Sequence, residues 1–126
     1  KIKILNLSNI GSIHNDLIDS AKVVNGVKVV FSKNIDKDIL VDLGKSFCSS
    51  KEKVIALLSN GSEKFNYCIS ISETLVEEGL DALKILKNIS NFISGGGGGR
   101  KNFVQGGGTR RKGLISSVEF IEKNLK

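Results

Sequence analysis

Two blocks of glycine near the C-terminus restrict the possible folds of this chain more than any other feature. Residues 94–113 read SGGGGGRKNFVQGGGTRRKG, and the two blocks are Gly95–Gly99 and Gly106–Gly108. Glycine runs usually behave as flexible linkers. Here, however, Phe103 and Val104 separate the blocks, and segments with helical apolar spacing abut both ends. We therefore favour an ordered loop over a linker.

Positive charge is concentrated in the same stretch. The 126 residues carry 19 basic and 13 acidic side chains, for a net charge of +6. Residues 95–126 contain seven of the basic groups and two of the acidic ones, a net of +5. Consecutive backbone N–H groups of glycine can converge on an anion, and nearby cations add to that attraction. We predict an anion-binding loop that Phe103 and Val104 anchor to the core, with Gln105 as a hydrogen-bonding arm.

The glycine stretch does not match the common nucleotide-binding loops. A Walker loop has Lys followed by Ser or Thr after its glycines, and the dinucleotide fingerprint follows a strand. In this chain a helical segment precedes the glycines, so both nucleotide-binding interpretations are weak.

Other chemistry is sparsely represented. Cys48 and Cys68 lie among apolar residues, so we expect two buried thiols in a reducing, cytoplasmic setting and neither a disulfide nor a metal site. His14 is the single histidine, without a serine–acid partner at recognisable spacing, so we predict no catalytic residue. The longest apolar runs have four or five residues, too few to cross a bilayer. The sequence lacks methionine, from which we expect that Lys1 is a cut point in a longer protein.

The N-terminal segment has the spacing of an amphipathic helix. This spacing predicts a helix that ends at Asn25-Gly26 with a left-handed cap. The apolar residues recur at intervals of three and four: Ile10, Ile13, Leu17, Ala21 and Val24. We assign residues 1–25 to a helical segment, the end of a helical or coiled-coil linker, and residues 26–126 to a globular domain. The apolar seam could pair two copies of the chain or belong to the core, and we favour the core.

The globular part alternates between strands and helices. Residues 27–31, 54–58 and 65–71 have the β-branched or alternating patterns of strands, and residues 54–58 are wholly apolar and so expected at the centre of the sheet. Helical spacing covers residues 34–47, 75–93 and 114–125, with a break at Gly79. These elements predict an α/β fold. A small mixed sheet would be covered by helices, with the glycine-rich loop between the last two helices.

The double glycine block resembles the C-terminal domain of alanyl-tRNA synthetases. That family has a GG-x-GGGR pattern, a short apolar stretch, and then a Gln with further glycines, which corresponds here to Ser94–Arg100 and Phe103–Gly108. The resemblance covers about residues 15–126. This chain departs from the usual pattern at four places. It has Ser94 where the family has Gly, Gly96 in place of Lys, Lys101-Asn102 in place of Pro-Asp, and Val104 in place of Ala.

The resemblance implies a non-catalytic module that contacts the tRNA elbow and so supports aminoacylation and editing by a ligase. ATP with magnesium, and zinc in an editing domain, would be bound in parts of the parent outside this fragment. The helices that precede such domains can form a homodimer. Related domains occur in DHH-family phosphoesterases, including RecJ-like exonucleases. A substrate-binding domain of such an enzyme is therefore an alternative function, and an oligomerisation module is a third.

Together these observations predict a nucleic-acid-binding site on the glycine stretch. Phosphates would be bound by backbone N–H groups and cations, and Gln105 would reach a base edge or a 2′-hydroxyl. The competing interpretation is that the glycines allow the flanking helices to pack closely and the cations are merely solvated. The predicted site comprises Gly95, Gly96, Gly97, Gly98, Gly99, Arg100, Lys101, Gln105, Gly106, Gly107, Gly108, Arg110, Arg111 and Lys112.

Overall fold

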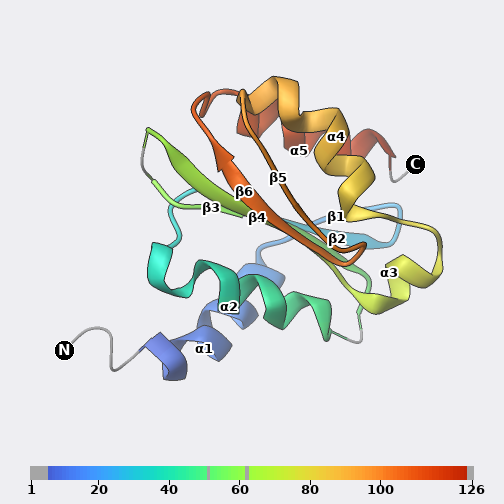
Figure 1. Ribbon diagram of the computed structural model, residues 1–126. Coiled ribbons are helices and arrows are strands. Elements are labelled where there is room, and N and C mark those ends of the chain that lie inside the picture. Colours follow the sequence, from blue (N-terminus) through green and yellow to red (C-terminus); the bar gives the residue numbers. More distant parts are fainter. Residues whose placement is uncertain (1–5, 51, 62, 125–126) are drawn as a thin grey trace.

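The computed structural model describes residues 6–50, 52–61 and 63–124. Within them, a six-stranded mixed sheet lies between two pairs of helices (Figure 1). One pair is α1 (Asn6–Asp19) and α2 (Lys37–Cys48), and the opposite pair is α4 (Ala82–Ile93) and α5 (Gly113–Asn124), while the short α3 (Glu73–Glu77) lies at one end. This arrangement confirms the predicted α/β class.

The strand order is β1-β2-β3-β4-β6-β5, and only the β2–β3 pair is parallel. The strands are β1 (Lys22–Val24), β2 (Val27–Ser32), β3 (Val54–Ser59), β4 (Phe65–Ile71), β5 (Gly96–Gly99) and β6 (Phe103–Gly108). All six residues of β3 are buried, which agrees with the central place predicted from its apolar run.

The predicted N-terminal helix is too long. Helix α1 ends at Asp19, and Lys22–Val24 form the edge strand β1. Asn25 and Gly26 have φ angles of 51° and 83°, and they connect two antiparallel strands as a two-residue hairpin turn. Asn-Gly suits both a helix cap and this turn, and pairing with β2 decides between them. The boundary drawn after residue 25 therefore falls between the two residues of this turn, within the β1–β2 hairpin.

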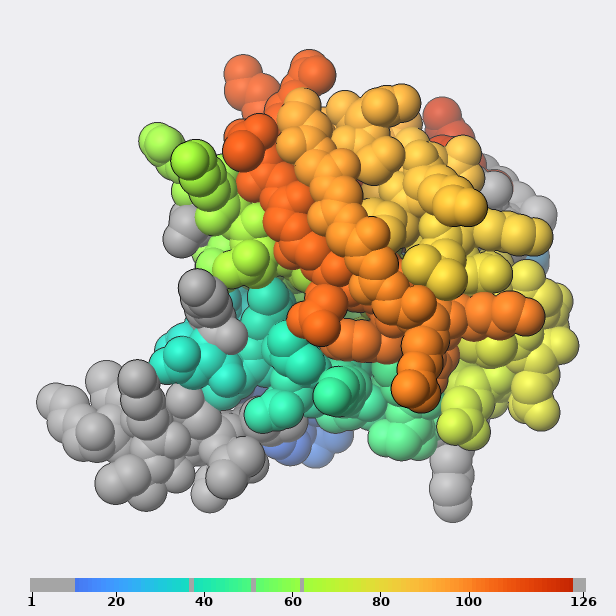
Figure 2. Space-filling view, viewed as in Figure 1, coloured from blue at the N-terminus to red at the C-terminus, as the bar shows by residue number. Residues whose placement is uncertain are grey.

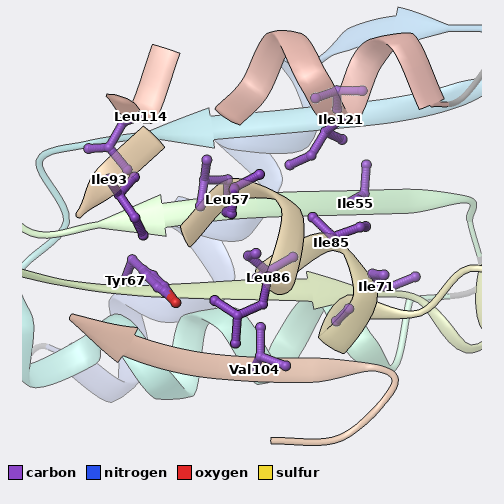
Figure 3. Packing of buried hydrophobic residues seen from close by; sticks show 14 of the residues in the cluster. Ile55, Leu57, Tyr67, Ile71, Ile85, Leu86, Ile93, Val104, Leu114 and Ile121 are labelled. Atoms are coloured by element: carbon purple, nitrogen blue, oxygen red, sulfur yellow. The ribbon is translucent and has the colours of Figure 1, made fainter. Parts of the chain in front are cut away.

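The core consists of one apolar cluster on each face of the sheet. The larger cluster joins the sheet to α4 and α5 through residues such as Ile55, Tyr67 and Leu86 (Figure 3). The smaller cluster joins the sheet to α2, and Ile13 and Leu17 of α1 pack against it. Three residues of the predicted seam, Ile13, Leu17 and Ala21, thus pack on the core, as we favoured. Val24 lies in β1 and packs against the larger cluster, and the side chain of Ile10 lies outside those that the structure describes. Gly79 has a φ of +106° and separates α3 from α4, so the predicted break is confirmed.

Candidate nucleic-acid interface

The glycine stretch forms a β-hairpin at the edge of the sheet and not the predicted loop. Strand β5 pairs with β6 from Gly96 opposite Gly107 to Gly99 opposite Val104, and β6 in turn pairs with β4. The N–H of Arg100 donates to the carbonyl oxygen of Phe103 at 2.8 Å and closes the turn. The hairpin crosses the front of the molecule between α2 and α4 (Figure 2).

Close approach of the two strands explains about half of these glycines. At four positions a Cβ atom would overlap backbone atoms of the opposite strand, so no larger side chain fits there. These positions are Gly95, Gly97, Gly99 and Gly106. By contrast, a Cβ at Gly96 or Gly98 would meet no atom within 4 Å. The fold therefore does not require glycine at these two exposed positions.

Two further glycines, one at the end of β6 and one at the start of α5, allow close packing against the end of α4. A Cβ at Gly113 would overlap the carbonyl of Phe92 in α4, and one at Gly108 would lie 2.8 Å from the carbonyl oxygen of Ile93. The interpretation that glycines permit close packing thus fits these positions, although it does not fit Gly96 or Gly98.

The structure divides the five predicted cations into two groups. Arg100 and Lys101 lie in the turn between β5 and β6, whereas Arg110, Arg111 and Lys112 follow the far end of β6. The six residues of β6 separate the groups by about 20 Å, at roughly 3.3 Å per strand residue. One phosphate cannot contact both groups.

Acidic side chains face the first group. Arg100 and Lys101 line a surface pocket of about 420 Å³ together with Glu73 and Glu77 of α3. The turn is fixed there, because the N–H of Ala82 donates to the carbonyl oxygen of Lys101 at 2.7 Å. The two carboxylates weaken the attraction of this end for phosphate.

The second group is more favourable for an anion. Arg110 and Lys112 are exposed, and the backbone N–H of Arg110 donates to the carbonyl oxygen of Ile93 at 3.0 Å. Arg111 is half-buried, and its guanidinium donates to the carbonyl oxygens of Lys33 at 3.2 Å and Asn60 at 3.4 Å. Arg111 thus holds neighbouring loops together, whereas Arg110 and Lys112 are exposed and can contact a ligand.

A second pocket adjoins Gln105. It encloses about 370 Å³ between helix α2 and the sheet, and its lining consists of Leu40, Val41, Asn66, Tyr67, Gln105 and Gly106. Gln105 and Gly106 belong to the predicted site, whereas sequence reasoning missed the other four residues. No local motif marks those four, because pairing of β4 with β6 and packing of α2 bring them to the pocket.

The remaining candidate groups have structural environments. The ring of His14 stacks on Phe47 with centroids 4.3 Å apart, and its Nδ1 lies 2.8 Å from Ser46 Oγ. Burial lowers the pKa of His14, and a smaller effect of Glu52 raises it. Both cysteines are free. Cys68 is buried and Cys48 only half-buried, and burial raises the pKa of each thiol, that of Cys68 to about 12.

The described ranges hold neither a metal cluster nor a membrane-spanning helix. No three or more His, Cys, Asp or Glu side chains in them are arranged to hold a metal ion. No helix among these residues has the length and apolar character needed to span a membrane.

The fold and the glycine hairpin define a small α/β domain of the DHHA1 family, whose signature matches residues 21–126, so the chain belongs to that family. Its relatives include the alanine–tRNA ligase of Pelotomaculum thermopropionicum, 37% identical over 90 residues that cover 68% of this chain and 10% of the ligase. The alanine–tRNA ligase of Bacillus velezensis is 32% identical over 100 residues, or 75% of this chain and 11% of the ligase. The chain therefore spans about a tenth of these relatives.

Solved structures show the same fold. The C-Ala domain from Aquifex aeolicus alanyl-tRNA synthetase matches with a TM-score of 0.74 at 19% identity, over 83% of this chain and 96% of that domain. The DHH domain of a member of a ribosomal-protein family matches with a TM-score of 0.63 at 14% identity, over 94% of this chain and 31% of that chain. The resemblance inferred from the glycine motif is confirmed at the level of family and fold.

Proposed function

We propose that this chain is the C-terminal domain of an alanine–tRNA ligase and binds the elbow of tRNA in support of aminoacylation and editing. The observation that carries the proposal is the exposed glycine strand β5 beside the exposed cations Arg110 and Lys112. Membership of the DHHA1 family and similarity to two alanine–tRNA ligases support the same function.

The charge distribution favours a polyanion on this side. The sequence has no Asp or Glu between Asp81 and Glu119, a stretch that includes α4, the hairpin and the start of α5. Because the acidic residues of α3 face the turn of the hairpin, we place the principal phosphate contacts at the opposite end, on Arg110 and Lys112. Backbone N–H groups of the glycine strands would supply further donors.

Counterion release provides the test. Replacing Arg110 and Lys112 with Ala removes two exposed cations, so tRNA affinity should fall roughly tenfold and the salt slope of log affinity should weaken by about one unit per lost contact. Binding is measured by fluorescence anisotropy of labelled tRNA at several salt concentrations.

The matched control removes the same charge elsewhere. Lys22 and Lys123 line the groove between β1 and α5, and β1 lies at the edge of the sheet opposite β5. Their double Ala variant should retain most of the affinity. Equal losses in the two double variants would show a nonspecific charge effect and contradict the assigned interface.

Several further predictions concern the whole parent protein and stay proposals. ATP with magnesium, zinc for editing and catalysis itself would belong to other parts of a ligase, and the protein would act in the cytoplasm. The homodimer through the N-terminal helix also stays a prediction.

A further inference from the structure

Gly96 and Gly98 need an explanation outside the packing of the protein. Both are exposed, neither has a left-handed φ, and a Cβ at either would meet nothing within 4 Å. Glycine inside a strand weakens it unless another backbone or a ligand approaches closely. No described residue fills the space in which a Cβ at Gly96 or Gly98 would stand, so this face of the backbone is open to a ligand.

The strand register places these glycines on the face that carries Gln105. Gly98 pairs with Gln105, Gly96 pairs with Gly107, and Gly107 pairs in turn with Asn66. Residues directly opposite each other in an antiparallel sheet project from the same face. Asn66 and Gln105 therefore border a surface that has almost no side chains.

The neighbouring pocket of about 370 Å³ has the chemistry of a site for a neutral, flat and polar group. Leu40 and Val41 of α2 provide an apolar wall, and the Asn66 and Gln105 carboxamides each provide a donor and an acceptor. No Asp, Glu, Lys or Arg lines the pocket, so nothing in it neutralises a phosphate or a carboxylate.

We infer that this pocket and the adjoining glycine face hold one unpaired RNA base, with its plane against the bare backbone and its edge within reach of Gln105 and Asn66. An unstacked base combines a flat apolar face with a donor-and-acceptor edge, and proteins read single-stranded RNA through such edges. The inference rests on the proposed function, since it assigns a base contact to the RNA whose phosphates would bind Arg110 and Lys112.

The experiment separates the base from the phosphates. Two single-stranded RNA hexamers are compared, one with bases and one abasic throughout, so that both carry the same phosphates. The full chain should bind the hexamer with bases roughly tenfold more tightly than the abasic one, as expected for about one stacked base.

Two substitutions locate the effect. Gly98→Val fills the open space above the strand with a residue that suits β-structure, and Gln105→Ala removes one carboxamide. Each should abolish most of the preference for bases and leave the salt slope unchanged, because no cation is lost. Asn15→Ala, which removes an exposed carboxamide from α1, is the control and should behave like the unsubstituted chain. Thermal unfolding checks that Gly98→Val remains folded.

The outcomes distinguish the two proposals. Equal binding of both hexamers, or an undiminished preference in the folded Gly98→Val and Gln105→Ala variants, overturns the base site and leaves tRNA binding intact. Failure of the unsubstituted chain to bind tRNA overturns the proposed function, and the base site with it.

Discussion

Gly113, the first residue of α5, lies directly against the backbone carbonyl of Phe92 in α4, where a Cβ atom would overlap it. Ser117 fixes the same turn, because its buried hydroxyl donates to the Gly113 carbonyl oxygen at 2.7 Å. Gly113 is thus the contact that lets the helices on either side of the glycine hairpin pack together.

We expect Gly113→Ala to lower the free energy of unfolding by about 2–3 kcal/mol, since the added methyl must push α4 and α5 apart. Gly96→Ala is the control, because its Cβ would stand in open space. It should leave the free energy of unfolding unchanged or raise it by up to about 1 kcal/mol, because Ala loses less backbone freedom than Gly on folding. Urea unfolding measures both, and equal stabilities would contradict the close contact.

Arg111 and Arg110 should differ in what their loss affects. The Arg111 guanidinium is bound to the carbonyl oxygens of Lys33 and Asn60, whereas Arg110 is exposed. We expect Arg111→Ala to lower the free energy of unfolding by about 1–3 kcal/mol, and Arg110→Ala to change it little. Urea unfolding of the two variants checks this, and comparable stability would show that Arg111 is not a structural contact.

Side-chain periodicity was sufficient to predict much of the fold. The apolar run of β3 and the alternation of β4 both predict strands, and the structure buries all six residues of β3 and six of the seven residues of β4. The break at Gly79 could also be predicted, since glycine is the residue type that adopts its positive φ at little cost.

One error lies where side chains carry no signal. Strand β5 consists of glycine alone, so nothing in Gly96–Gly99 alternates, and only pairing with β6 makes it a strand. The same limit applies to the cations. Their nearness in sequence suggested one cluster, but an extended β6 carries Lys101 and Arg110 to opposite ends of the hairpin.

The single histidine should make stability depend on pH near neutrality. Burial lowers the pKa of His14 in the folded chain below the 6.5 of the unfolded chain. The unfolded state therefore binds more protons as the pH falls through 6.5, and acidification lowers the free energy of unfolding until folded His14 is itself protonated. Above pH 6.5, where His14 is neutral in both the folded and the unfolded chain, the free energy of unfolding no longer depends on this residue's titration.

Urea unfolding between about pH 5 and pH 8 measures this pH dependence for the unsubstituted chain and for His14→Gln, whose side chain is neutral throughout. The unsubstituted chain should lose stability on acidification relative to the variant, because no other histidine titrates in this range. Parallel pH profiles would show that His14 is not desolvated against Phe47.

The two thiols should react at different rates. The thiolate is the reactive form, and burial raises the pKa of both thiols, that of Cys68 to about 12. Cys68 is also fully buried, whereas Cys48 is half-buried and lies 3.2 Å from the carbonyl oxygen of Asn102 in the hairpin turn.

We therefore expect iodoacetamide at neutral pH to modify Cys48 slowly and Cys68 only as fast as the chain unfolds. Mass spectrometry of the digested protein at successive times measures both rates, and a urea-unfolded sample supplies the rate of the free thiols. Labelling of native Cys68 at that free rate would mean that α2 does not cover β4 as described. Slow labelling that accelerates in the Gly113→Ala variant would instead report the same loss of stability as urea unfolding, because Cys68 becomes exposed only when the whole chain unfolds.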